Sequence, residues 1–123
     1  MNLWLIAIGG ATGAVARAVL ASAVVRVPGV PVAVGTAVVN LLGCLVFGLI
    51  AGAASGRVTL SPEARALLLT GLLGGFTTFS SYMSDSLTLW RDGQAVWALV
   101  NLAGQVLGGV LVFAAGWAAG LAL

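Results

Sequence analysis

The chain divides into four long apolar stretches that are separated by three short polar breaks. The apolar stretches cover about residues 3–25, 32–53, 64–89 and 95–119. Each is near or above the ~20 residues that an α-helix needs to cross the hydrocarbon core of a bilayer. No soluble domain or long linker interrupts them. The pattern predicts an all-α membrane protein whose four spans form a single domain over residues 1–123.

The polar breaks carry the expected signals for helix ends. They read RVPGVP at 26–31, SGRVTLSPE at 55–63 and WRDGQ at 90–94. In the second break, Ser61 followed by Pro62 is typical of a helix start, with serine as the N-cap and proline at the first helical position. We therefore expect the third helix to begin there.

The third span contains a segment that is unfavourable for a helix, GLLGGFTTFSSYMSD at 71–85. Each residue of the Gly74–Gly75 pair costs about 1 kcal/mol of helix propensity relative to alanine. The β-branched pair Thr77–Thr78 adds restricted side-chain rotamers. We predict a broken third helix, which a membrane tolerates only where the freed backbone groups are buried in protein or line a wet cavity. The alternative is a kinked but continuous helix whose hydroxyls bond their own carbonyls.

Composition supports a chain built for lipid. Hydrophobic residues make up 61% of the sequence and charged residues 7%, with a mean hydropathy of +1.17, whereas soluble domains carry roughly 25% charged residues. The net charge of +2 is too sparse for a nucleic-acid partner. With no histidine and only Cys44 as a thiol, the usual histidine and cysteine metal sites and an enzyme active site are not expected.

The arginines give no bias in orientation. Arg26 and Arg91 lie in the first and third breaks, while Arg57 and Arg65 lie at the second. Positive residues normally crowd the cytoplasmic loops and so fix topology. Either the insertion signal lies elsewhere, or the chain inserts both ways and pairs as an antiparallel, dual-topology homodimer. Four helices can hardly enclose a polar path alone, which favours the homodimer.

Several polar side chains lie inside the spans, where each is costly and therefore a functional candidate. They are Arg17, Thr36, Asn40, Asp85, Asn101 and Gln105. Asn101 and Gln105 are one turn apart and share a helix face. The amides offer N–H donors without a full charge. Simpler interpretations remain open, namely that Arg17 snorkels to the headgroups and that Asn40 makes an interhelical hydrogen bond.

Three segments resemble the signature blocks of the Fluc (CrcB) fluoride-channel family. They are GGATGAVAR at 9–17, GTAVVNLLGCLVFG at 35–48 and GLLGGFTTFSSY at 71–82. Their order and spacing match across nearly the whole chain, and the third block is the most specific. The resemblance implies a multi-pass protein of the bacterial inner membrane. It would work as an antiparallel homodimer that passively exports fluoride and so lowers its toxicity.

The resemblance also implies an ion at the helix break. By this resemblance, one structural Na⁺, which is not transported, would lie at the dimer centre. Backbone carbonyls would hold it. Carried over to this chain, those carbonyls belong to Gly74 and Thr77.

For the anion pathway, the resemblance implies four residues: Asn40, Phe79, Ser81 and Tyr82. Aromatic rings carry positive edges, which can face an anion. Tyr82 stands in place of the family's second pore phenylalanine, and Ser81 stands where threonine is common.

Secondary candidates complete the expected pathway. Asp85 replaces the usual glutamate, and Thr36 lies one turn before the pore asparagine. Arg17 ends the first block and would attract anions or brace the dimer. Asn101 and Gln105 are candidates for the polar track of the fourth helix.

Two other functions are compatible with four small spans. A proton-coupled antiporter needs a titratable carboxylate in the membrane, for which Asp85 is the only candidate. A non-conducting subunit of a heterodimeric channel would carry the same family features without transporting an ion by itself.

Overall fold

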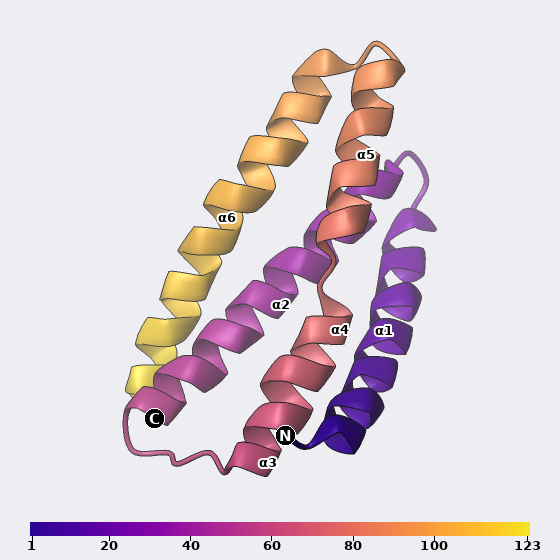
Figure 1. Cartoon of the computed structure of the whole chain (residues 1–123). Coiled ribbons are helices and arrows are strands. Elements are labelled where there is room, and N and C mark those ends of the chain that lie inside the picture. The colour runs from indigo at the N-terminus through magenta and orange to yellow at the C-terminus, as the bar shows by residue number, and fades with distance from the viewer.

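The structure, a computed structural model, describes all 123 residues and is helical throughout (Figure 1). Its elements are α1 (Leu3–Val25), α2 (Val32–Ser55), α3 (Pro62–Ala64), η1 (Arg65–Leu73), α4 (Gly74–Phe76), α5 (Phe79–Arg91) and α6 (Ala95–Leu121). Elements α3 to α5 together form the third of four spans that are long and apolar enough to cross a membrane. The all-helical, four-span prediction is confirmed. The last three spans extend slightly beyond the limits of 32–53, 64–89 and 95–119 expected from the sequence.

The chain runs back and forth along one axis. Both termini and the loop between α2 and α3 lie at one end, and the other two loops lie at the opposite end (Figure 1). Arg57 and Arg65 are therefore at one end, and Arg26 and Arg91 are at the other. The balance of positive charge in the sequence is thus a balance between the two faces of the membrane.

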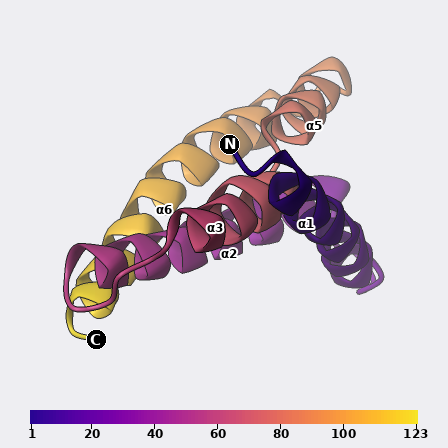
Figure 2. The ribbon, with the colours of Figure 1, turned by 60° about the horizontal axis from the view of Figure 1, so that its bottom comes forward.

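The two halves of the third span pack against different helices. Its first half, η1 and α4, packs against α1, and its second half, α5, packs against α6 and α2. The end view shows α1 and α6 on opposite flanks of α2 (Figure 2). Long helix pairs approach closely because glycine removes the side chain at the crossing: a methyl group at Gly48 or Gly52 of α2 would overlap the backbone of α6.

Little of this chain is buried in itself. Only 19 of the 123 residues are buried, and Val39 is the one large side chain that is fully enclosed. Large apolar side chains are exposed on all four spans. A surface this apolar needs lipid or another protein surface against it, as expected of a membrane protein.

The third span is broken where the sequence predicts. It starts as expected, with Ser61 accepting a hydrogen bond of 3.1 Å from the Ala64 N–H and Pro62 in the first turn. The helix ends at Phe76, and Thr77 and Thr78 are extended, with ψ of 156° and 117°. A second helix then begins at Phe79, so the alternative of a continuous, kinked helix is wrong.

One feature of the third span was not predicted from the sequence. Segment η1 is a π-helix of 9 residues, a wider and rarer coil that often occurs near functional sites. Most of this segment is leucine and alanine, which form ordinary α-helices well, and nothing in their order distinguishes the two coils.

Candidate functional site

The break leaves backbone carbonyls with different partners. Thr77 closes the first half, because both its N–H and its hydroxyl donate to the Leu73 carbonyl, at 3.1 and 3.0 Å. Arg17 reaches across from α1, and its Nε donates to the Gly75 carbonyl at 3.1 Å. The carbonyls of Gly74 and Thr77 accept none of the hydrogen bonds formed around the break. Both oxygens are therefore free of hydrogen-bond donors at the break.

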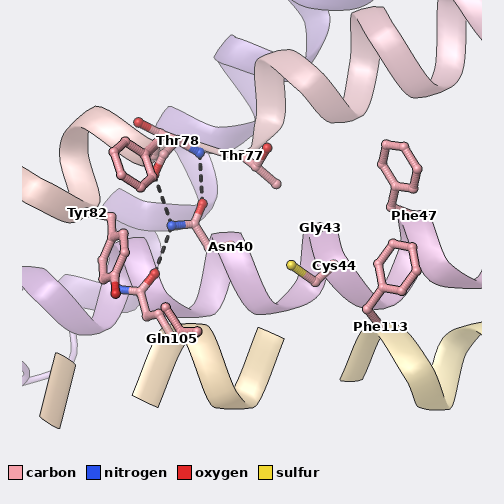
Figure 3. A pocket seen from close by; sticks show the side chains of 11 residues that line it. Asn40, Gly43, Cys44, Phe47, Thr77, Thr78, Tyr82, Gln105 and Phe113 are labelled. Carbon is pink, nitrogen blue, oxygen red and sulfur yellow. Dashed lines mark hydrogen bonds between the residues drawn. The ribbon is translucent and has the colours of Figure 1, made fainter. Parts of the chain in front are cut away.

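Asn40 takes the place of the missing helical partners of Thr78. The Thr78 N–H donates to Asn40 Oδ1 at 2.8 Å, and Asn40 Nδ2 donates to the Thr78 carbonyl at 3.0 Å (Figure 3). One side-chain amide thus satisfies both polar groups of an extended residue inside the membrane span, where unpaired groups are costly. These two hydrogen bonds fix the position of the break against α2.

A chain of side-chain hydrogen bonds continues from Asn40 through three helices. Asn40 Nδ2 donates to Gln105 Oε1 at 2.8 Å, and Gln105 Nε2 donates to Asn101 Oδ1 at 2.9 Å. Asn101 Nδ2 donates to Ser86 Oγ at 2.9 Å, and the Ser86 hydroxyl donates to the Tyr82 carbonyl at 2.8 Å. Gln105 and Ser86 are buried. We call this set, from Thr78 to Tyr82, the amide chain.

A cavity of about 380 Å³ opens beside the break. Its lining holds no charged side chain and consists of Asn40, Gly43, Cys44, Phe47, Thr77, Thr78, Phe79, Tyr82, Gln105, Val106 and Phe113. Figure 3 shows the Asn40 amide at one end and the rings of Phe47 and Phe113 at the other. The cavity therefore joins neutral donors to aromatic surface, and we call it the break cavity.

The two aromatic candidates differ in their surroundings. Phe79 is 74% exposed, whereas Tyr82 is 6% exposed. Their rings meet edge to face, with centroids 5.9 Å apart. The Tyr82 hydroxyl donates to the Leu102 carbonyl of α6. Tyr82 is thus anchored between helices, while the ring of Phe79 is free on the surface of a single chain.

The remaining predicted residues lie outside the break cavity. The Thr36 hydroxyl donates to Asp85 Oδ2 at 2.6 Å and so joins α2 to α5. Ser81 is not in the lining, and its N–H donates to Thr78 Oγ1 at 3.2 Å as part of the cap of α5. Arg17 does not line the cavity, and its Nε donates to the Gly75 carbonyl.

A second cavity of about 650 Å³ lies between the first halves of α2 and α6 and the end of α5. Asn101 and Gln105 both belong to its lining, and Gln105 is the one residue shared with the break cavity. We call this second space the outer cavity.

Two participants in the amide chain were missed from the sequence. Ser86 was not a candidate, although it lies one turn after Tyr82 and hence on the same face. Thr78 was expected only as part of the break, and its role as the backbone partner of Asn40 has no sequence signal. Hydrogen bonds between helices depend on their packing, which a single sequence does not display.

These observations define the class of protein: a small multi-pass membrane protein with an interrupted span and a neutral, donor-lined cavity at the interruption. Residues 4–117 match the family described as "CrcB-like protein, Camphor Resistance (CrcB)". The chain belongs to this family. A bacterial inner membrane fits a chain of this kind.

Similar proteins cover nearly the whole chain. This chain is 41% identical over 115 residues to the "Fluoride-specific ion channel FluC" of Maridesulfovibrio salexigens. The aligned residues cover 94% of this chain and 91% of that protein. It is 45% identical over 119 residues to the protein of the same name from Solidesulfovibrio magneticus, covering 97% and 95%. A third protein with this name, from Chlorobaculum tepidum, is 45% identical over 109 residues, covering 89% and 86%.

Proposed function

We propose that this protein is a fluoride-specific ion channel that passively exports F⁻ from the cytoplasm and so lowers its toxicity. The observation that carries the proposal is a charge-free cavity of amide donors and aromatic edges at a break inside a membrane span. Its relatives are named fluoride-specific ion channels. The family is one of ion channels and not of enzymes.

The cavity suits a small anion on chemical grounds. Neutral N–H and O–H donors and the positive edges of rings stabilise an anion without trapping it beside a full positive charge. Fluoride enters a cell as the neutral weak acid, which ionises inside and cannot leave through lipid. A path that carries the ion lets it run down its electrochemical gradient.

The proposal extends to an antiparallel, dual-topology homodimer. Two arginines at each end leave no preferred orientation, and large apolar side chains remain exposed on every span. Phe79 is mostly exposed in one chain, so a second copy would complete the wall around its ring. Reporter fusions at one terminus, active on both sides of the membrane, would support this arrangement.

A structural Na⁺ at the dimer centre is also part of the proposal. The carbonyls of Gly74 and Thr77 fit a hard cation, because they are oxygen ligands without hydrogen-bond donors around the break. These residues would hold the ion, which would supply a fixed positive charge near the anion pathway. Exhaustive removal of sodium should lower fluoride efflux or weaken the dimer. Efflux and dimer mass that are indifferent to sodium would contradict this part.

Fluoride efflux from proteoliposomes made with the purified chain alone tests the channel. We expect efflux that follows the membrane potential without proton coupling, measured with a fluoride electrode. A proton requirement would favour an antiporter, although the only acid in the apolar part of the third span, Asp85, is bonded to Thr36 and lines neither cavity. If the purified chain alone gives no fluoride efflux, the result would favour a subunit that needs a related partner.

Replacing the exposed ring supplies the sharpest variant. Phe79→Ile removes the aromatic edge from the cavity and should abolish most of the fluoride flux while the protein stays folded. Phe76→Ile is the matched control, because Phe76 ends the first half-helix beside the same break but does not line the cavity. Undiminished flux in Phe79→Ile would remove this residue from the pathway.

A further inference from the structure

We propose that Gly43 of α2 is a positioning residue for the cation site, because its missing side chain leaves the space that the Thr77 methyl group fills. The inference rests on the structural Na⁺ proposed above and deepens it. It follows from the contacts that hold Thr77 at the break and from the direction in which the next peptide plane faces.

Three contacts hold Thr77 in place. Its backbone N–H and its hydroxyl both donate to the Leu73 carbonyl, at 3.1 and 3.0 Å. Its methyl group lies against Gly43, where an added Cβ atom would overlap Thr77 Cγ2. Gly43 is buried, and both residues belong to the lining of the break cavity (Figure 3). The hydroxyl and the methyl group of Thr77 are therefore accommodated together, one by the first half-helix and the other by α2.

The methyl group of Thr77 cannot turn away from α2 at no cost. A β-branched side chain is stiff at χ1, and a rotation that moved the methyl group would also take the hydroxyl from the Leu73 carbonyl. The other atoms near a Cβ at position 43 are at ordinary contact distances, with Phe76 Cδ1 at 3.4 Å and Thr77 Cβ at 3.7 Å. The methyl group is thus the one obstacle to a side chain at position 43, and such a side chain would displace Thr77 as a whole.

The peptide bond after Thr77 connects this packing to the cation site. A trans peptide is planar, so its C=O and its N–H point in opposite directions. The N–H of this peptide belongs to Thr78 and donates to Asn40 Oδ1 of α2 at 2.8 Å. The Thr77 carbonyl at the other end of the plane therefore points away from the Asn40 side chain. A displacement of Thr77 moves this carbonyl, which is one of the two proposed ligands.

A methyl group can be moved from one side of this contact to the other. Gly43→Ala overfills the contact and should shift the Thr77 carbonyl. Thr77→Ser keeps the hydroxyl for Leu73 and removes the methyl group. The double variant Gly43→Ala/Thr77→Ser transfers the methyl group to position 43, and substitutions that conserve packed volume are tolerated best. We therefore expect the double variant to bind Na⁺ better than Gly43→Ala alone, which is the opposite of additive losses.

The unfolding midpoint of the purified full-length protein in detergent, measured against sodium concentration, tests the inference. N-methylglucamine replaces sodium to keep ionic strength constant. An ion that binds only the folded state raises the midpoint by mass action, so the wild-type midpoint should rise with sodium. Gly43→Ala should need roughly tenfold more sodium or above for the same rise, the usual scale for groups that orient metal ligands.

Gly104→Ala is the matched control. It also adds one methyl group to a glycine inside a long helix, but a Cβ at Gly104 meets nothing within 4 Å. Its sodium dependence should stay within about twofold of the wild type, as for substitutions that disturb no contact.

The shape of the sodium dependence separates positioning from simple packing. If Gly43 matters only for packing, Gly43→Ala lowers the midpoint by the same amount at every sodium concentration, and the inference is overturned. If it positions a ligand, the difference from the wild type grows as sodium is added. Should Gly43→Ala fail to fold, the double variant decides. A folded double variant with a sodium-dependent midpoint supports the inference, and one that is unfolded or indifferent to sodium overturns it.

The outcomes also distinguish this inference from the proposed function. A wild-type midpoint that is indifferent to sodium would remove the cation site and, with it, the role of Gly43, whereas fluoride efflux from proteoliposomes would still support the channel. A sodium-dependent wild type with an unchanged Gly43→Ala would overturn the role of Gly43 alone and leave the cation site in place.

Discussion

The two halves of the third span are held in different ways. The first half, from Pro62 to Phe76, is in contact with α1 backbone to backbone: a methyl group at Gly75 would overlap the backbone of Gly10, and one at Gly9 would overlap that of η1. The second half, α5, is held by side-chain hydrogen bonds, which run from Tyr82 and Ser86 to α6 and from Asp85 to α2.

The difference shows what each kind of contact provides. Backbones that meet at glycine lie close together and place no polar side chain between the helices. The first half of the third span is therefore held in position against α1. Hydrogen bonds between side chains have direction, so the second half can orient groups toward a cavity. At the break, Arg17 from α1 bonds the Gly75 carbonyl at the end of the first half, and Asn40 from α2 bonds the backbone of Thr78. The break is therefore fixed from both sides.

The largest expected effect tests the close contact of the first half. Gly9→Ala should lower the free energy of unfolding by about 3 kcal/mol, because the new methyl group meets backbone that cannot move aside. Gly10→Ala is its neighbour and matched control: its nearest atom, the Gly71 carbonyl oxygen, is 3.9 Å away, so alanine should be neutral or stabilise by up to ~1 kcal/mol. Denaturant unfolding in detergent measures both. Equal effects would show that α1 and η1 are not packed this closely.

An intermediate effect tests the hydrogen-bonded half. Ser86→Ala removes the link between the Asn101 amide and the Tyr82 carbonyl and leaves Asn101 Nδ2 without its partner in a half-buried place, which should cost about 2 kcal/mol. Ser84→Ala lies on the same helix, where the serine is exposed and unbonded, and should change stability by less than about 0.5 kcal/mol. The same unfolding measurement compares the two variants. If Ser86→Ala leaves the free energy of unfolding unchanged, the hydrogen bonds of Ser86 do not stabilise the fold as described.

The smallest effect tests a single anchor. Tyr82→Phe removes only the hydroxyl that donates to the Leu102 carbonyl, so the expected loss is about 1 kcal/mol of unfolding free energy. Thermal unfolding monitored by tryptophan fluorescence measures the shift. A midpoint that does not move would mean that the ring, and not the hydroxyl, holds α5 against α6.

Sequence patterns predicted the positions of the helices and of the break well. Span length and hydropathy gave the four helices, Ser61 and Pro62 gave the start of the third, and the glycine and threonine pairs gave its break. Each of these signals is local, because it depends on residues within one turn or one span. The shared face of Asn101 and Gln105 is local too, and the two side chains are hydrogen-bonded.

The remaining features depend on contacts between spans. The chain has 18 glycines, and nothing in the sequence showed which of them meets another helix, as Gly9 meets η1. Arg17 had several possible partners until the crossing of α1 and α4 placed the Gly75 carbonyl beside it. The wide coil of η1 and the role of Ser86 likewise appear only once the helices are packed.

The pairing of Asn40 with Thr78 has a consequence for sequence tolerance. Position 40 must offer one acceptor and two donors at the reach of a short side chain. Aspartate lacks the donors, glutamine is one methylene too long and serine has a single hydrogen. Asn40 therefore has few replacements, because it serves the backbone of Thr78 and the side chain of Gln105 at the same time.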